Sequence, residues 1–479
     1  MTDLYLGADR ATESEAAAVD AALRARGVDP VVRAETERLY TSGRARRRER
    51  RHYLLPALHA LQNAAGWISP GGINYIAGYD GLASSVRAEG GHVHLGPCLG
   101  QCERAPALFV QGAGGRPDYV PADAEPFELP QAGDPSLRLL RRIGTADPES
   151  LESYIAHGGY EALRRAGQMG AEAVLEAVAA SGLSGRGGAA FPTGVKWRAV
   201  AAETGRPKHV VANCDESEPG TFKDRIVMEQ DPFAGAIERL RTAGLLGPDA
   251  AGTGHDFDIA IWRGAGAYIC GEETALFNSL EGFRGEPRNK PPFPTTHGSV
   301  GEPTAINNPE TLLNVLDVII EGPDAYRSRG TERSPGTKLL CLSGNVRRSG
   351  LYEVPFGTTL GDLLALAGGI TGTGELQAVL MGGAAGSFVG PDSLGLPLTL
   401  EDTRAAGTTL GSGVVMAFDT SVDMTDVVVR IAEFFRNESC GQCVPCRVGA
   451  VRQHETLVQM QKRGSLSPAP RPSSTTWPR

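Results

Sequence analysis

The sequence predicts a multidomain α/β protein, and three observations support this fold class. The chain has 479 residues, which is enough for about three domains. Residues 184–320 alternate strand-like and helix-like runs, the order that is typical of an α/β domain. Residues 337–418 contain short strands and glycine turns around one helix, 360–366, which predicts a smaller α+β module.

Composition excludes several classes of protein. Hydrophobic residues make up 41% of the chain, and the formal net charge of -9 argues against nucleic-acid binding. No run approaches the roughly 20 apolar residues that span a bilayer, and no signal peptide is visible. Eight cysteines, three of them within seven residues, suit a reducing compartment and metal binding better than disulfides. We expect a cytoplasmic protein with no membrane span, which reaches the inner face of a membrane only through partners.

The N-terminal part is predicted to contain helices, strands and a linker. Residues 13–65 read as helical because leucines recur at helical spacing near their end. Residues 44–51 hold six arginines and one glutamate, which indicates a solvated helix face, with a docking patch as the alternative. Apolar pieces that alternate with glycine predict strands over 91–112, and the proline-rich, acidic residues 118–134 predict a linker.

The following segments are assigned in the same way. Residues 150–181 are predicted to be helical, while Val210–Ala212 and Ile259–Ile261 are predicted strands. Residues 425–435 form a predicted helix that leads into the cysteine cluster. The Ser/Pro-rich residues 464–479 are expected to be disordered.

A glycine-rich loop, Ser184–Trp197, follows a predicted helix. Four glycines in ten residues allow backbone N–H groups to form an anion-binding nest, and Lys196 can add a point charge for a phosphate. The loop does not follow a strand and does not fit G-x-G-x-x-G, which disfavours a Rossmann site. We favour a phosphate site over an ordinary loop.

Two further polar segments follow predicted strands. Asp215, Glu216 and Glu218 place three carboxylates in four residues, which can accept hydrogen bonds from sugar or ribityl hydroxyls; an exposed acidic turn is the alternative. Downstream, two carboxylates begin a predicted helix, where the helix dipole favours them even without a ligand. Phe293, among three prolines, presents an aromatic face suited to stacking on an adenine or flavin ring.

The segment Glu438–Arg447 contains the pattern C-x2-C-x2-C. Thiolates at this spacing can converge on one iron–sulfur cluster, in which a cysteine usually holds each iron. The candidate ligands are Cys440, Cys443 and Cys446. Three cysteines between the predicted N-terminal part and this cluster are interpreted as buried packing residues: Cys214, Cys270 and Cys341.

In this order, the glycine loop, the acidic turn, the G-x-G-x-Y-I-C-G-E-E-T segment and the cysteine triplet resemble the FMN- and NADH-binding flavoprotein subunit of respiratory complex I. The diaphorase subunits of NAD-reducing hydrogenases and NAD-dependent formate dehydrogenases share the pattern. The resemblance covers about residues 150–455 and implies FMN in a non-standard α/β fold, with NADH stacked on the flavin as substrate.

The resemblance also implies site residues. FMN contacts would fall on Gly185, Arg186, Gly187, Lys196, Asn213, Asp215, Glu216, Gly271, Glu272, Asn307, Asn308 and Thr311. NADH contacts would fall on Phe191, Glu218, Glu273, Lys290 and Phe293. Cys440, Cys443 and Cys446 match three of the four ligands of the family's [4Fe-4S] cluster. No cysteine follows Cys446, so the iron–sulfur segment is expected to be incomplete, and His454 is a less favoured substitute for the missing ligand.

The N-terminal part has its own resemblance. Residues 54–68 and Pro97–Pro106 resemble the thioredoxin-like [2Fe-2S] partner subunit. Only Cys98 and Cys102 are present, and two thiolates cannot complete a four-ligand site, so the domain is expected to lack a cluster; a redox disulfide is the alternative. The resemblance divides the chain into a thioredoxin-like domain (1–130), an FMN- and NADH-binding α/β domain (131–335), a β-grasp, ubiquitin-like module (336–420), a helical iron–sulfur segment (421–463) and a disordered tail (464–479).

The function that this resemblance implies is that of an NADH dehydrogenase. Electrons would pass from NADH through FMN to the [4Fe-4S] cluster and to partner subunits, namely an iron–sulfur subunit and a dehydrogenase or hydrogenase module. No catalytic side chain is expected, because the hydride chemistry belongs to the cofactors. Acidic residues near the ribose would repel the 2′-phosphate of NADPH. Two alternatives remain: a diaphorase that reduces NAD⁺ with electrons from formate or hydrogen, and a non-catalytic scaffold.

Overall fold

The computed structural model describes residues 107–110, 118–121, 129–147, 150–204, 207–230, 237–264, 266–371 and 374–463. The expectations for the N-terminal helices, the arginine-rich stretch, Cys98, Cys102 and the C-terminal tail lie outside these residues. Near the N-terminus the described part is a pair of antiparallel strands, β1 (Ala107–Val110) and β2 (Asp118–Pro121). The chain divides into two compact units, and one of them ends at Asp419.

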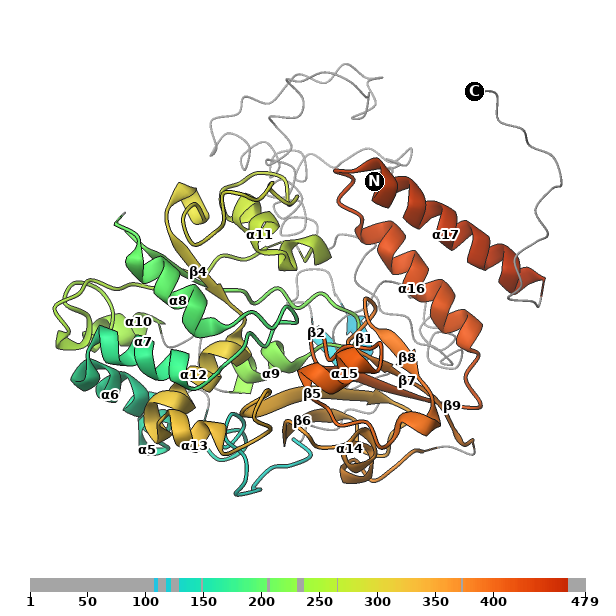
Figure 1. Ribbon diagram of the computed structural model, residues 1–479, viewed down its shortest axis with the longest axis horizontal. Helices are drawn as coiled ribbons and strands as arrows, with labels where there is room; N and C mark the ends of the chain where they lie inside the picture. Colours follow the sequence, from blue (N-terminus) through green and yellow to red (C-terminus); the bar gives the residue numbers. More distant parts are fainter. Residues whose placement is uncertain are drawn as a thin grey trace, which may run out of the picture. The chain divides into compact units, whose positions relative to one another are not determined.

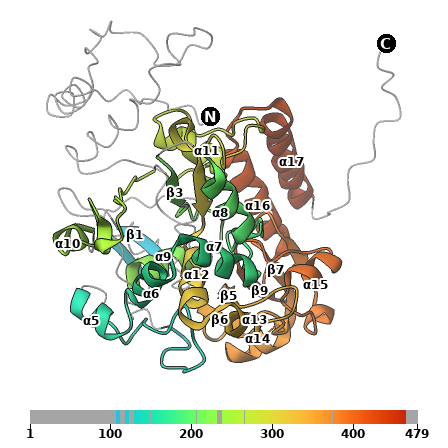
Figure 2. The same cartoon turned by 60° about the vertical axis from the view of Figure 1, so that its left-hand side comes forward.

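Short helices pack around one longer helix, α12 (Pro309–Glu321), in the larger unit (Figures 1 and 2). They are α6 (Glu161–Met169), α7 (Ala171–Ala180) and α13 (Pro323–Arg327). The short helix α5 (Leu151–Ala156) precedes α6 in the chain. Val178 and Val318 are fully buried in the core that α7 and α12 share. The predicted helical stretch 150–181 is therefore confirmed as three helices.

A two-stranded parallel sheet lies beside these helices. β3 (His209–Ala212) pairs with β4 (Thr304–Asn307), and Ala212 is in register with Asn307. The strands therefore end together, and the residues that follow them meet at one edge. Four more helices belong to this part: α8 (Thr193–Ala202), α9 (Lys223–Gln230), α10 (Ile237–Thr242) and α11 (Glu273–Leu280).

The predicted strand Ile259–Ile261 is wrong. The run has the composition of a strand, but its residues form no ladder in the described structure. Phe257, just before it, pairs with Gly247 in an isolated antiparallel bridge. Strand composition favours an extended backbone, but a strand also requires a neighbouring chain in register.

A five-stranded sheet completes the larger unit, with the order β6-β5-β9-β7-β8. β5 and β9 are parallel and the other pairs are antiparallel. The strands and the two helices of this part have the following bounds: β5 (Thr337–Gly344), β6 (Gly350–Pro355), β7 (Leu376–Met381), β8 (Ser387–Val389), β9 (Val414–Asp419), α14 (Leu360–Leu366) and α15 (Leu400–Ala405). The predicted helix 360–366 is confirmed.

Both faces of this sheet are covered. In β5, Leu340 and Leu342 pack into one core with Leu363 of α14. Leu339 and Cys341 of the same strand point to the opposite face, into a second core that contains Phe222 at the start of α9. Successive side chains of a strand point to opposite faces. β5 therefore contributes to two cores, one with α14 and one with Phe222 beside α9.

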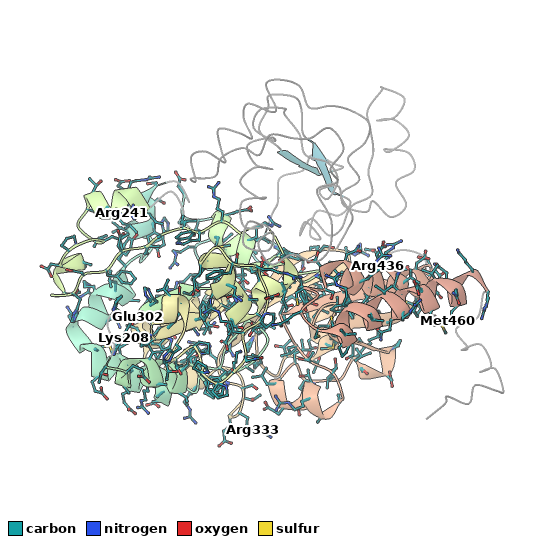
Figure 3. All side chains as sticks on the ribbon, turned by 90° about the horizontal axis from the view of Figure 1, so that it is seen from above. Lys208, Arg241, Glu302, Arg333, Arg436 and Met460 are labelled. Carbon is teal, nitrogen blue, oxygen red and sulfur yellow. The ribbon has the colours of Figure 1, made fainter. Side chains whose placement is uncertain are left out.

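The smaller unit contains a helical hairpin. α16 (Met424–Glu438) begins at Asp423, whose carboxylate accepts a hydrogen bond from the N–H of Thr425 at 2.8 Å. α17 (Val444–Lys462) returns antiparallel to α16, and Arg436 and Met460 mark the two helices in Figure 3. Among the described helices, none combines the length and the apolar character that crossing a membrane requires.

Candidate functional site

A cavity of about 360 Å³ lies where β3 and β4 end. Asn213 directly follows β3 and Asn308 directly follows β4, so the parallel register brings both amides to the same edge. Ligands of α/β proteins commonly bind at the carboxyl ends of parallel strands. The cavity is lined by Gly187, Asn213, Asp215, Glu216, Ser217, Glu218, Thr221, Lys223, Asp224, Tyr268, Ile269, Gly271, Glu272, Asn308 and Ser412.

The acidic turn after β3 is fixed against the segment before α11. The side-chain amide of Asn213 donates to the carbonyl of Gly271 at 2.9 Å, and its oxygen accepts from the N–H of Asp215 at 3.2 Å. A Cβ at Gly271 would lie 3.1 Å from Oδ2 of Asp215, closer than ordinary contact. Asp215 also accepts from the hydroxyl of Ser217 at 3.0 Å. The turn therefore presents carboxylates in fixed positions at the cavity.

Glu216 lies at the N-terminus of α9. Its two carboxylate oxygens accept hydrogen bonds from the backbone N–H groups of Asp224 and Arg225, at 2.9 and 2.8 Å. Burial, together with repulsion from Asp224, raises the pKa of Glu216 to about 7. Glu216 can therefore hold or release a proton near neutral pH.

Glu218 contacts both the segment before α11 and the five-stranded sheet. Its Oε1 accepts from the N–H of Ala385 at 2.9 Å, and a Cβ on Gly383 would lie only 2.4 Å from Cγ of Glu218. Burial and a hydrogen bond with Glu218 raise the pKa of Tyr268. The phenol of Tyr268 therefore stays protonated and can donate a hydrogen bond.

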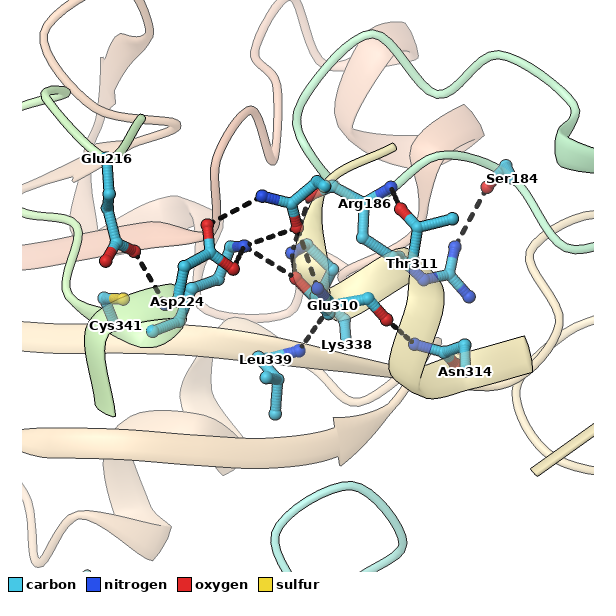
Figure 4. Close-up of polar contacts among 12 residues, drawn as sticks. Ser184, Arg186, Glu216, Asp224, Glu310, Thr311, Asn314, Lys338, Leu339 and Cys341 are labelled. Carbon is cyan, nitrogen blue, oxygen red and sulfur yellow. Dashed lines mark hydrogen bonds and ion pairs between the residues drawn. The ribbon is translucent and has the colours of Figure 1, made fainter. Parts of the chain in front are cut away.

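A network of buried charges supports the floor of the cavity (Figure 4). The Nζ atom of Lys223 lies 2.7 Å from Oδ1 of Asp224, 2.9 Å from Oδ1 of Asn308 and 3.3 Å from Oε2 of Glu310. The Nδ2 atom of Asn308 donates to Asp224 at 2.7 Å. The opposing charge of Asp224 and Glu310 raises the pKa of Lys223 despite burial. The amide of Asn308 is therefore held in one orientation.

The network extends into the five-stranded sheet. Lys338 in β5 lies 2.6 Å from Oε2 of Glu310, and the N–H of Leu339 donates to Oε1 of Glu310 at 2.8 Å. Neither Glu310 nor Lys338 is appreciably exposed. The two lysines hold the pKa of Glu310 below its usual value despite its burial.

In the glycine loop, the side chain of Arg186 points away from the cavity. Its guanidinium donates to the hydroxyl of Tyr326 and the carbonyl of Pro335, both at 2.9 Å, and lies 4.6 Å from the ring centre of Phe356. Its backbone N–H donates to Oγ1 of Thr311 at 2.8 Å. Arg186 and Thr311 therefore shape the loop but do not line the cavity.

Gly187 does line the cavity, in close contact with Asn308. A Cβ at Gly187 would approach Cβ of Asn308 to 3.0 Å. Lys196 and Asn307 lie behind this wall, where Lys196 donates to the carbonyl of Ile306 at 2.8 Å and Asn307 accepts from the indole of Trp197 at 2.9 Å. Burial lowers the pKa of Lys196.

Two residues expected to contact NADH, Glu273 and Lys290, form a compact charged group with Glu272, which was expected to contact FMN. Lys290 lies 2.9 Å from Glu272 and 2.7 Å from Glu273. Glu272 also begins α11, where it accepts from the N–H groups of Thr274 and Ala275, both at 2.9 Å. Burial acts to raise the pKa of Glu272, but the hydrogen bonds from Thr274, Lys290 and Ala275 outweigh it and lower this pKa. Phe191 and Phe293 are exposed, at 49% and 57%.

The cavity thus brings together eight of the expected residues: Gly187, Asn213, Asp215, Glu216, Glu218, Gly271, Glu272 and Asn308. The expected residues outside its lining are Gly185, Arg186, Phe191, Lys196, Glu273, Lys290, Phe293, Asn307 and Thr311. Seven lining residues were not predicted from the sequence: Ser217, Thr221, Lys223, Asp224, Tyr268, Ile269 and Ser412. The first four belong to the same acidic segment as Asp215 and Glu216, so they could have been predicted by extending the candidate site along that segment.

The lining fits a flavin mononucleotide. Side-chain amides and carboxylates at the strand ends supply hydrogen-bond partners for hydroxyls and ring amides. Gly187 allows backbone approach where a side chain would meet Asn308. The hydroxyl of Ser412 is buried in the wall without a hydrogen-bond partner in the described structure, as expected of a group that a ligand satisfies.

The three clustered cysteines lie at the junction of α16 and α17. Cys443 directly precedes α17 and Cys446 lies in its first turn. Ser439 lies within hydrogen-bond distance of Cys446, with Oγ 3.3 Å from Sγ. In the described residues no three His, Cys, Asp or Glu side chains meet at a single metal ion. His454 instead contacts Arg436, at 3.0 Å. The three cysteines are thus close in sequence at the helix junction, but in the described residues they do not converge on one site.

The remaining cysteines differ in burial. Cys341 is fully buried and accepts a hydrogen bond from the N–H of Phe222 at 3.3 Å. Burial raises the pKa of Cys341, and it raises the pKa of Cys214 to about 12. Cys214 and Cys270 are only partly buried. Neither Cys214 nor Cys341 is therefore a reactive thiolate.

Comparisons with known proteins agree with this site. A family model described as the Nuo51 FMN-binding domain matches residues 178–241 and 233–317. An SLBB domain matches residues 339–383, and the NADH-ubiquinone oxidoreductase-F iron–sulfur binding region matches residues 426–468. These models cover all of the cavity lining except Ser412, most of the first three strands of the five-stranded sheet (β5, β6 and β7), and the cysteine segment.

Curated relatives and solved structures give the same result. The second F subunit of the NADH-quinone oxidoreductase of Rhizobium meliloti is 44% identical over 65% of this chain and 82% of its own length. The corresponding F subunit of Escherichia coli is 40% identical over 63% of this chain and 76% of its own length. A chain of an NAD⁺-reducing [NiFe]-hydrogenase, in its H2-reduced state, is 31% identical with a TM-score of 0.67, over 82% of this chain and 76% of its own.

The expected FMN-binding domain and iron–sulfur region are therefore confirmed, each on the part of the chain where its motif was found. With relatives that are 40% or more identical over at least three quarters of their length, the chain belongs to the family of F subunits of NADH-quinone oxidoreductase.

Proposed function

We propose that this chain is an NADH-oxidising flavoprotein subunit that passes electrons from NADH through FMN to an iron–sulfur cluster and partner subunits. The observation that carries the proposal is the cavity at the ends of β3 and β4. It gathers eight residues expected to contact the cofactor and the substrate from segments as far apart as Gly187 and Asn308.

The chain's own residues would bind and orient FMN. Gly187 would form part of the phosphate site, in a loop that the N–H of Arg186 ties to Thr311. Asp215 would accept hydrogen bonds from hydroxyls of the ribityl chain, and the amides of Asn213 and Asn308 would bond the chain and the ring. The other expected contacts are Gly185, Lys196, Glu216, Gly271, Glu272, Asn307 and Thr311. When bound, FMN supplies the chemistry that accepts a hydride and releases electrons singly.

NADH would bind over the flavin, between the acidic turn and the α11 segment. Glu218, Glu273 and Lys290 would contact its polar groups, and the exposed rings of Phe191 and Phe293 could stack on its bases. Carboxylates near the ribose would disfavour the 2′-phosphate of NADPH. No side chain is required as a base, so the protein contributes binding, orientation and electrostatics.

The proposed domain boundaries remain those that the sequence predicts. The five-stranded sheet has the strand content of the proposed β-grasp module, 336–420. The thiolates of Cys440, Cys443 and Cys446 would hold three positions of a [4Fe-4S] cluster, which stores single electrons when bound. The partners would be other subunits of an electron-transfer complex. No membrane span is needed in the chain itself, because such partners would supply contact with a membrane.

A second candidate is a diaphorase subunit that reduces NAD⁺. The structural likeness to a chain of an NAD⁺-reducing hydrogenase, at 31% identity over 82% of this chain, favours it specifically. The flavin site would be the same and only the direction of electron flow would differ. Identification of the subunits that co-purify with the chain decides between the two: complex I-like partners support NADH oxidation, and hydrogenase or formate dehydrogenase subunits support the diaphorase.

One experiment tests the flavoprotein assignment directly. Protein purified without oxygen is examined by absorbance spectroscopy before and after NADH is added, with NADPH as the matched control. We expect a flavin spectrum that NADH bleaches and NADPH bleaches far more slowly. A colourless protein that does not take up added FMN would instead identify a scaffold that has lost the activity.

A further inference from the structure

The turn before β9 contributes Ser412 to the wall of the cavity. Ser412 lines the cavity, and its hydroxyl oxygen is buried without a hydrogen-bond partner in the part of the chain that the structure describes. Buried hydroxyls normally have partners, because burial without one costs free energy. A ligand atom in the cavity would supply the hydrogen bond that the hydroxyl of Ser412 does not make in the described structure.

The turn is held rigidly. The carbonyl of Gly413 accepts from the N–H of Cys341 in β5 at 2.7 Å, and the N–H of Gly413 donates to Leu410 at 2.8 Å. Gly411 and Gly413 adopt positive φ angles of 47° and 98°, and a Cβ on either would come within 2.5 Å of a carbonyl oxygen. Two glycines therefore fix Ser412 between them, and the sequence G-S-G is required by this geometry.

The Ser412 turn also abuts the glycine loop. A Cβ on Gly188 would lie 3.5 Å from the carbonyl carbon of Gly411 and 3.8 Å from the backbone nitrogen of Ser412. Gly187, the neighbouring residue of the loop, lines the same cavity. The hydroxyl of Ser412 is thus placed beside the loop whose backbone we assign to the phosphate of the flavin nucleotide.

We propose that the hydroxyl of Ser412 donates a hydrogen bond to the phosphate of FMN, so that the five-stranded sheet supplies part of the flavin site. This inference rests on the proposed function, because it assumes FMN in the cavity. The proposal adds an FMN-binding residue from a turn that lies outside the glycine loop, the acidic turn and the segment before α11. A hydrogen bond to an ionised phosphate is stronger than one between two neutral groups.

The test compares flavin binding to full-length protein from which flavin has been removed. Dissociation constants for FMN and for riboflavin, which lacks the phosphate, are measured by flavin fluorescence for the wild type and for Ser412→Ala, Ser412→Thr and Ser343→Ala. Ser343 in β5 is the matched control, because its hydroxyl is also buried without a partner in the described structure but does not line the cavity.

Ser412→Ala should weaken FMN binding by about tenfold or more, the loss expected for a hydrogen bond to a charged group. Riboflavin binding should stay unchanged, Ser412→Thr should retain FMN affinity, and Ser343→Ala should match the wild type. Unchanged FMN affinity in Ser412→Ala, or equal losses for FMN and riboflavin, would overturn the phosphate contact. A wild-type protein that binds neither flavin would refute the proposed function itself.

Discussion

Glu310 of α12 and Lys338 of β5 form a buried ion pair, with Oε2 and Nζ 2.6 Å apart. Lys223 approaches the same carboxylate oxygen to 3.3 Å and also bonds Asn308 at the cavity. The pair therefore connects the five-stranded sheet to Asn308, which lines the cavity, through the single side chain of Lys223. Buried charges of this kind are costly when one partner is removed.

Lys338→Met should destabilise the protein by about 3–5 kcal/mol, because it leaves Glu310 buried with one of its two cations missing. Equilibrium unfolding in urea measures the loss. The double variant Lys338→Met with Glu310→Gln is the control, since removal of both charges should cost less than the sum of the single changes. Additive losses would mean that the two residues do not interact.

Stability should depend on pH through Glu216. Its pKa is raised from the ordinary value of 4.5 to about 7 in the folded protein, so the folded state binds the proton more tightly than the unfolded state. Stability therefore falls as the pH rises from about 4.5 to about 7, by at most about 3 kcal/mol. Thermal unfolding across this range measures the slope, and Glu216→Gln should flatten it. An identical slope in the variant would assign the titration to another group.

Gly187→Ala should weaken FMN binding with little loss of stability. The added Cβ would meet Cβ of Asn308 at 3.0 Å and push the amide from its position at the cavity. FMN titration followed by fluorescence measures the effect, which we expect to be about tenfold. Gly167→Ala is the matched control, because a Cβ there meets nothing within 4 Å and lies inside α6, where alanine stabilises a helix by up to about 1 kcal/mol.

Glu273→Gln should alter the affinity for NADH or the release of product, while leaving bound FMN in place. Glu273 lies outside the cavity lining, and both it and Glu272 form ion pairs with Lys290. We therefore expect its charge to affect bound NADH more than bound FMN. A change of about tenfold in KM for NADH, with unchanged flavin content, is the expected outcome. Loss of flavin from the purified variant would instead place Glu273 in the FMN site.

Local sequence predicted much of the site because its residues directly follow regular elements. Val210–Ala212 was recognisable as a strand, so Asn213 and the carboxylates after it were expected at the strand's end, and the cavity confirms that placement. Glu272 was expected at a helix N-terminus, and it caps α11 there. Each of these placements depends on neighbours in sequence alone.

Contacts between distant segments could not be predicted. Arg186 was expected among the FMN contacts, but its guanidinium bonds Tyr326 and Pro335 in the interior. Lys223 followed the acidic turn in sequence, but its partner Glu310 comes 87 positions later on α12. Ser412 carried no local signal at all, because its position depends on how a separate sheet packs beside the glycine loop.

The order of strands in the five-stranded sheet bears on biosynthesis. β9 is the last of the five to leave the ribosome, yet it lies between β5 and β7. The sheet, and with it the Ser412 wall of the cavity, cannot close until residues through Asp419 have been translated. A cofactor can therefore be enclosed by the whole cavity only late in synthesis. A polypeptide released before that point would lack the side of the cavity that Ser412 lines.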